Sequence, residues 1–331
     1  MSEPCGSLQP CEEGCGMDCS TGSAIRDGMA PRKTRSGEGK AHRFGGDWTN
    51  AKLDVLAKYL SAYTKALKNQ PFTKGYIDAF AGTGYRTMCE DEDESSQELL
   101  FPEPQAGERE ALLEGSATLA LKTKPRFDGY VFIERNSARC AQLEALKEEF
   151  PDLAPDIQIR EGEANAEIQK LCALPWQRRR AVLFLDPYGM QVEWTTIEAV
   201  ARTHAIDTWL LFPLGVAVTR LLTKSGKIPD AWRRSLDRLL GTTDWYDEFY
   251  RVEKTFTLFG QEERVVRATA DSIGRYFNKR LKTVFADVAD QPGVLRNSAN
   301  VPLYLLCFAV GNARGATPAL RIAKSLLKGV Q

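Results

Sequence analysis

The chain has 331 residues, of which 43% are hydrophobic and 27% are charged, a composition typical of a soluble globular protein. Lys and Arg total 44, as do Asp and Glu, so the overall charge favours neither a nucleic-acid nor a membrane partner. No apolar run reaches the roughly 18 residues that span a bilayer, and no signal peptide is evident. Together with the scattered single cysteines of the body, this predicts a cytoplasmic protein.

Residues 1–45 are predicted to form a disordered arm, because they are rich in Gly, Ser, Pro and charge and poor in large apolar side chains. Cys11, Cys15 and Cys19 lie within it at C-x3-C-x3-C spacing. Thiolates at this spacing could hold zinc or an iron–sulfur cluster, but the spacing matches no established site. A flexible tail is the simpler interpretation, and no metal site is predicted.

Residues 46–331 are predicted to form one doubly wound α/β domain. An amphipathic helix begins near Trp48, with apolar residues recurring every three or four positions at Leu53, Leu56, Leu60, Tyr63 and Leu67. Five apolar strands are expected at 76–80, 130–133, 157–160, 181–185 and 207–212. Helices are expected between them at 116–124, 137–149, 166–172 and 194–202. Continuous apolar strands that alternate with helices indicate a parallel sheet buried on both faces.

Beyond the fifth strand, the pattern predicts a helical insertion at 224–262. The elements expected after it are a helix at 264–282, strands at 283–288 and 302–310, and a helix at 316–328. The side chains of Trp232 and Trp245 in this insertion could either be buried in the hydrophobic core or stack on a substrate. Two more strands bring the predicted sheet to seven.

Polar residues follow four consecutive predicted strands, and ligands of open α/β sheets bind beyond the carboxyl ends of the strands. In chain order, the residues at these strand ends, polar ones and their neighbours, are Asp78, Phe80, Gly82 and Gly84, then Glu134, then Glu163 and Asn165, and finally Asp186, Pro187 and Tyr188. Four such strand ends in register indicate a site for a nucleoside-containing ligand.

A dinucleotide suits this site poorly. Its G-x-G-x-x-G fingerprint would place the third glycine at Thr87. The acids at 90–94 would also repel a pyrophosphate. S-adenosylmethionine (SAM) has an adenosine and a sulfonium cation but no phosphate, and it fits better.

Each strand end has an expected role toward SAM. Gly82 and Gly84 would let the backbone approach the amino-acid moiety. Glu134 would accept hydrogen bonds from the ribose hydroxyls. Either Glu163 or Asn165 would meet the adenine amine, and Asp78 would support the glycine loop.

Two motifs resemble those of class I SAM-dependent methyltransferases. The D-x-F-x-G-x-G of residues 78–84 resembles their first motif. Asp186-Pro187-Tyr188 resembles the D/N-P-P-Y/F of enzymes that methylate exocyclic amines, although Tyr188 stands where the second proline would be. A similar D-P-F-G occurs in guanine-N2 methyltransferases of tRNA. The resemblance implies a Rossmann-like, seven-stranded sheet with SAM as cofactor.

More narrowly, YIDAFAGTG, VFIERN, EGEAN and VLFLDPYGMQVEWTTI resemble segments of the three-Cys-motif partner proteins, a bacterial methyltransferase-like family. The resemblance covers roughly residues 48–222. It implies a neighbouring protein partner with three cysteines, similar to radical-SAM enzymes.

The expected activity is methylation of an exocyclic amine on a nucleic-acid base. Asp186 and the Pro187 carbonyl would accept hydrogen bonds from the amine, and Tyr188 would stack on the flipped base. Arg178–Arg180 and Arg233–Arg234 could contact phosphates. Three alternatives stay open: a SAM-binding or inactive partner subunit, methylation of proteins or small molecules, and a plain strand-to-helix turn at 186–189.

Overall fold

The structure is a computed structural model that describes residues 47–82, 115–257 and 260–330. The predicted arm with Cys11, Cys15 and Cys19 lies outside these residues, as does Gly84. Along the described residues, no helix has both the length and the apolarity needed to cross a membrane.

A single large sheet organises the fold, with strand order β3-β2-β1-β4-β5-β10-β8 and with β9 also paired to β10. The strand bounds are β1 Thr73–Asp78, β2 Gly129–Glu134, β3 Ile157–Glu161, β4 Arg179–Leu185, β5 Ile206–Phe212, β8 Asp287–Val288, β9 Gly293–Arg296 and β10 Pro302–Val310. The first five strands are mutually parallel, and β10 runs antiparallel to β5. The predicted Rossmann-like, doubly wound fold is confirmed, with the order reversing between β1 and β4 and with eight strands in place of the predicted seven.

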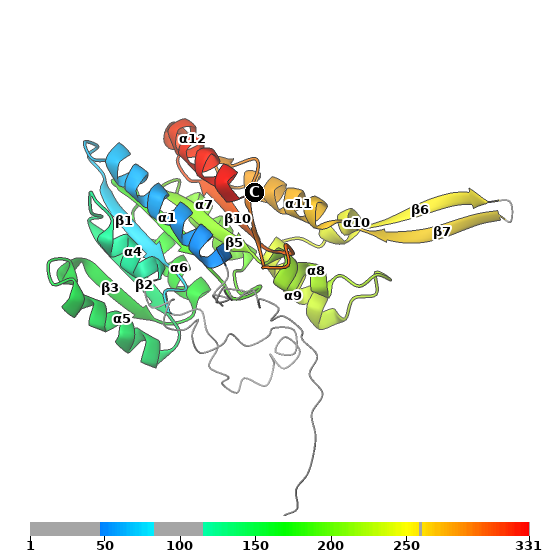
Figure 1. Ribbon diagram of the computed structural model, residues 1–331, viewed down its shortest axis with the longest axis horizontal. Helices are drawn as coiled ribbons and strands as arrows, with labels where there is room; N and C mark the ends of the chain where they lie inside the picture. Colours follow the sequence, from blue (N-terminus) through cyan, green and yellow to red (C-terminus); the bar gives the residue numbers. More distant parts are fainter. Residues whose placement is uncertain (1–46, 83–114, 258–259, 331) are drawn as a thin grey trace, which may run out of the picture. The chain divides into compact units, whose positions relative to one another are not determined.

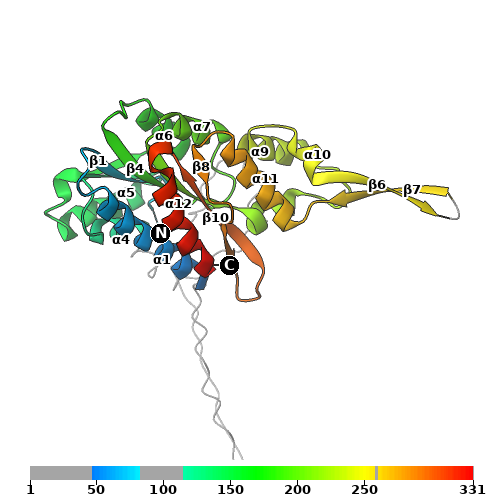
Figure 2. The same cartoon turned by 90° about the horizontal axis from the view of Figure 1, so that it is seen from above.

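Helices cover both faces of the sheet (Figures 1 and 2). On one face lie α1 Asp47–Ala66, α4 Ser116–Lys122, α5 Ser137–Glu149 and α12 Ala316–Leu327. On the other lie α6 Ala164–Cys172, α7 Trp194–Arg202, α9 Asp230–Leu240, α10 Trp245–Phe249 and α11 Ala270–Lys282. Successive strand residues therefore enter different cores: Tyr76 packs with α1 and Ile77 with the opposite layer.

The insertion after β5 differs from the prediction. Residues 230–240 (α9) and 245–249 (α10) are helical, but Tyr250–Thr257 (β6) and Gly260–Arg267 (β7) form an antiparallel pair of strands. Figures 1 and 2 show this pair as a ribbon separate from the large sheet. β-Branched residues such as Val252 and Val265, directly opposite each other, favour strands here. The helix expected from residue 264 accordingly begins at Ala270.

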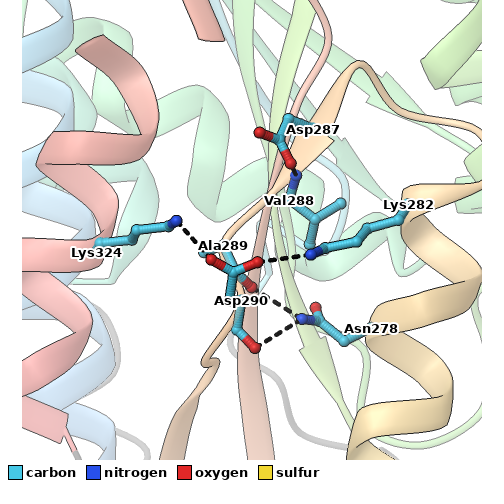
Figure 3. Close-up of polar contacts among 7 residues, drawn as sticks. All are labelled: Asn278, Lys282, Asp287, Val288, Ala289, Asp290 and Lys324. Carbon is cyan, nitrogen blue, oxygen red and sulfur yellow. Dashed lines mark hydrogen bonds and ion pairs between the residues drawn. The ribbon is translucent and has the colours of Figure 1, made fainter. Parts of the chain in front are cut away.

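Asp290 links helices that lie on opposite faces of the sheet (Figure 3). Its carboxylate accepts hydrogen bonds of 2.6 Å from Lys282 of α11 and from Lys324 of α12. These two contacts lower the pKa of Asp290 to about 2. The Asn278 amide donates to the backbone oxygens of Ala289 and Asp290 at 2.9 and 3.0 Å. Because the Asp290 side chain is 57% exposed, the ion pairs fix local geometry and add little stability.

Gly241 fixes how α9 ends against α7, and its substitution tests this contact. Its φ of +66° suits glycine, and a Cβ there would lie 2.0 Å from the Trp194 ring. We expect Gly241→Ala to lower the free energy of unfolding by about 3 kcal/mol, through left-handed strain and overpacking. Gly315→Ala is the matched control, because a Cβ there meets nothing within 4 Å. Equal urea midpoints for the two variants would contradict this account.

Candidate active site

The carboxyl ends of the central strands lie level with one another. Asp78, the last residue of β1, pairs with Phe132 of β2 on one side and with Phe184 of β4 on the other. Glu134 and Asp186 each follow two residues after those partners. The sheet register therefore brings three predicted acids to one edge, which is where ligands of this fold bind.

Asp78 is fully buried at the centre of this edge. Its Oδ1 accepts a hydrogen bond from Phe80 N at 3.3 Å, and its Oδ2 accepts one from the Tyr76 hydroxyl at 3.2 Å. Burial raises its pKa to about 6, and the nearby charge of Asp186 adds to the rise, whereas a hydrogen bond from Ser116 opposes it. Asp78 therefore holds the backbone of the turn that follows β1, and its role toward a cofactor stays a prediction.

Gly82 lies directly against the carboxylate of Glu134. A Cβ on Gly82 would be 1.8 Å from Glu134 Oε2, so only glycine lets the backbone come this close. Glu134 is 9% exposed, and its Oε1 accepts a hydrogen bond of 2.8 Å from Asn136 N. Arg139 of α5 stands 3.9 Å from the same oxygen. The acid expected to hold a ribose is thus held in place beside the glycine loop.

Glu163 and Asn165 form one hydrogen-bonded unit at the start of α6. Glu163 caps the helix, since its carboxylate accepts from Asn165 N and Ala166 N at 2.9 and 2.8 Å. The Asn165 amide donates to Glu163 at 2.7 Å and to Gln191 O at 2.8 Å, and its oxygen accepts from Glu193 N at 3.0 Å. Asn165 therefore ties α6 to the segment after β4. The contact of either residue with adenine stays a prediction.

Asp186 forms an ion pair that sequence reasoning missed. The Lys52 ammonium of α1 donates to Asp186 Oδ2. The Lys52 side chain is 5% exposed and that of Asp186 is 24% exposed. Pro187, which follows, is buried. The acid of the Asp186-Pro187-Tyr188 motif is thus anchored by a helix that precedes the sheet in the chain.

Aromatic side chains flank this ion pair. Trp48 stacks on Tyr304 of β10, with ring centroids 5.3 Å apart, and the Lys52 ammonium lies 5.2 Å from the Trp48 ring centroid. The Tyr304 hydroxyl donates to the carbonyl oxygen of Tyr188 at 3.4 Å. The turn after β4 is therefore held from α1 and from β10.

The signal that could have revealed Lys52 is its position on α1. The buried face of this helix consists of residues that recur three and four positions after Lys52 and repeat that pattern along the helix: Lys52, Val55, Leu56, Tyr59, Leu60, Tyr63 and Thr64. Leu53, which the predicted stripe included, is only half-buried. A lysine in register with such a stripe is a marked exception, because lysine is rarely buried without a partner.

Other candidate residues lie away from this edge. Arg178–Arg180 lie at the amino end of β4, the opposite end of the strand from Asp186. Trp245 is completely buried and Trp232 half-buried in one core, so both serve the hydrophobic core. Within the described ranges, His, Cys, Asp and Glu form no group of three or more that could hold a metal ion.

Comparisons with known proteins find distant structural similarity only. The chain matches no protein-family model and no curated protein. Membership of the three-Cys-motif partner family accordingly stays a prediction.

Three solved structures illustrate the similarity. Protein LPL1258 of Legionella pneumophila, assigned to the family DUF519, is 11% identical, with a TM-score of 0.40 over 86% of this chain and 93% of its own. The putative methyltransferase yhhF of Escherichia coli is 11% identical, with a TM-score of 0.25 over 64% and 86%. The N-terminal domain of EvdMO1, crystallised with SAH and D-fucose, is 13% identical, with a TM-score of 0.32 over 77% and 82%. The fold assignment rests on the strand order of this chain itself.

The residues at this edge fit SAM in two respects. The Gly82 backbone approaches a nearly buried acid at the end of β2, where a ribose would lie. Asp78, Glu134 and Asp186 also place three carboxylates at the edge, and although Arg139 and Lys52 pair with two of them, carboxylate oxygens accept hydrogen bonds from hydroxyl and amino groups such as those of SAM.

The raised pKa of Asp78 makes a prediction about stability. Its folded pKa of about 6 exceeds the ordinary value of 3.8, so the folded state binds the proton more tightly than the unfolded state. The stability that Asp78 gains in acid is therefore lost as the pH rises from about 4 to about 6. Relative to Asp78→Asn, the wild-type free energy of unfolding should fall by about 2 kcal/mol over this range. If urea unfolding gave the same free-energy difference between wild type and Asp78→Asn at every pH, this prediction would be wrong.

Proposed function

We propose that the protein is a SAM-dependent methyltransferase that acts on an exocyclic amine of a nucleic-acid base. The observation that carries the proposal is the convergence of Gly82, Glu134 and Asp186 on the carboxyl edge of a methyltransferase-type sheet. Glu134 would bind the ribose and Gly82 would border the amino-acid moiety, with Gly84 beside it. Asp186 directly follows β4, on the other side of β1 from Glu134, and this position suits a residue that receives the acceptor.

Asp186, Pro187 and Tyr188 would carry the chemistry. When bound, SAM would supply a methyl group to the amine nitrogen, with the C–S bond breaking as the C–N bond formed, the electron pair staying on sulfur, and one proton of the nitrogen passing to solvent. The Asp186 carboxylate and the Pro187 carbonyl would accept hydrogen bonds from the amine and turn its lone pair toward the methyl group. Alignment of this kind is the main requirement of a direct displacement.

The half-buried side chain of Tyr188 is proposed to stack on the base. Stacking of a base on an aromatic ring contributes about 1–3 kcal/mol and tolerates different bases. The Tyr188 backbone is fixed on both sides, since its N–H donates to Gln191 Oε1 at 3.1 Å and its carbonyl accepts from Tyr304. A fixed backbone would limit how far the ring moves when the acceptor binds.

Asp186→Ala tests the proposed chemistry. Because the carboxylate acts on the acceptor, we expect SAM affinity to change less than threefold and methyl transfer to fall by about a thousandfold. The assay uses radiolabelled SAM with RNA, DNA and protein fractions of a cell extract, with and without a three-cysteine radical-SAM-like protein. Asp230→Ala, at the start of α9, is a control that removes an exposed aspartate from outside the site.

Transfer that persists in Asp186→Ala would reject the role of this carboxylate. Label found only on protein or small molecules would reject the base as acceptor. SAM binding without transfer to any fraction would favour the alternative, a SAM-binding partner subunit that catalyses nothing by itself.

A further inference from the structure

We infer that Lys52 is a positioning residue of the acceptor site: its buried ammonium holds Asp186 in one orientation, with Oδ2 bound and Oδ1 presented to the amine. This inference rests on the proposed function for the identity of the acceptor. It adds a residue from α1, a helix that carries none of the recognised sequence motifs.

The first argument is the burial of Lys52. Only 4% of the residue is exposed, and it occupies the same helix face as Val55, Leu56 and Tyr59. An apolar side chain would suit that face better, because a buried ion pair is often less stable than an apolar replacement of similar volume. The lysine is therefore poorly explained by stability alone.

The choice of partner is the second argument. Lys52 donates to the acid of the Asp186-Pro187-Tyr188 motif, although Asp78 carries another carboxylate at the same edge. The pair leaves the burial of the two groups unequal, with 5% of the lysine side chain and 24% of the aspartate side chain exposed. The buried ammonium of Lys52 thus fixes the carboxylate of Asp186, which itself stays partly exposed to solvent.

The support around the ammonium is the third argument. Trp48, one turn before Lys52, provides its ring face to the cation and stacks on Tyr304. Tyr304 in turn binds the carbonyl of Tyr188. Lys52 and Tyr304 therefore hold the two ends of one three-residue motif, so displacement of α1 would disturb both the carboxylate and the proposed stacking residue.

The presence of the coupled pair can be tested without any methyl acceptor. Urea unfolding is measured for Lys52→Met, Asp186→Asn and the double variant. Each single variant leaves one buried or half-buried charge unpaired, so we expect the double variant to lose less than the sum of the two midpoint shifts. Additive shifts would overturn the inference.

The positioning role is tested by kinetics. We expect Lys52→Met to lower kcat about a hundredfold, since misalignment of this size follows from small displacements, with KM for SAM changed less than threefold. Lys52→Arg keeps the charge and should recover at least a tenth of wild-type kcat. In an Asp186→Ala background, Lys52→Met should have no further effect.

Lys58→Met is the matched control. Lys58 lies on the same helix and pairs with Asp54 at 2.5 Å, but its side chain is 59% exposed and its partner is no part of the site. Its loss should leave kcat unchanged. Equal effects at positions 52 and 58, or no rescue by Lys52→Arg, would overturn the positioning role. A wild-type protein without any methyl transfer would instead reject the proposed function, while the unfolding cycle still decides whether Lys52 holds Asp186.

Discussion

The level register of β2, β1 and β4 is the constraint on which the site depends. Asp78 pairs with both Phe132 and Phe184, so the residues that follow these strands emerge at one edge. A shift of one residue in either pairing would turn the strand's side chains to the opposite face. Helices on both faces exclude such a shift, because every central strand is buried between two apolar cores. The packing of the two apolar cores therefore fixes the register that brings Asp78, Glu134 and Asp186 to one edge of the sheet.

Carboxylates at a shared edge repel one another, and the fold opposes this with a separate donor for each. Asp78 accepts from Phe80 N, and Glu134 accepts from Asn136 N. Glu163 caps α6, whereas Asp186 binds the distant Lys52. The first three donors are backbone groups that directly follow the acid in the chain. Glu134 also has the Arg139 guanidinium of the following helix 3.9 Å away, whereas the cation of Asp186 comes from 134 residues earlier in the chain. A partner brought from so far is consistent with a carboxylate whose orientation matters for an incoming acceptor.

Sequence patterns predicted the elements whose contacts are local or periodic. Helices Ser137–Glu149 and Trp194–Arg202 and strand Pro302–Val310 were located from periodicity and apolar runs, because these patterns report directly on burial. The β6–β7 pair was mistaken for helix, since the described side chains beyond Tyr250, such as Arg251, Val252 and Glu253, are exposed and give no burial pattern that would mark a strand. Lys52 was missed because its contact with Asp186 spans 134 residues, and such a pairing exists only in the folded chain.

The central claim is that the carboxyl edge of the sheet binds SAM. Hydrogen–deuterium exchange with and without SAM tests this most directly, because it reports both binding and its place. We expect slower amide exchange at 78–82, 134–136 and 163–166 when SAM is present. Exchange should stay unchanged at the opposite edge, where Asp207 accepts hydrogen bonds from Tyr59 and Gly311. Unchanged exchange throughout the chain, or protection confined to that opposite edge, would contradict the account.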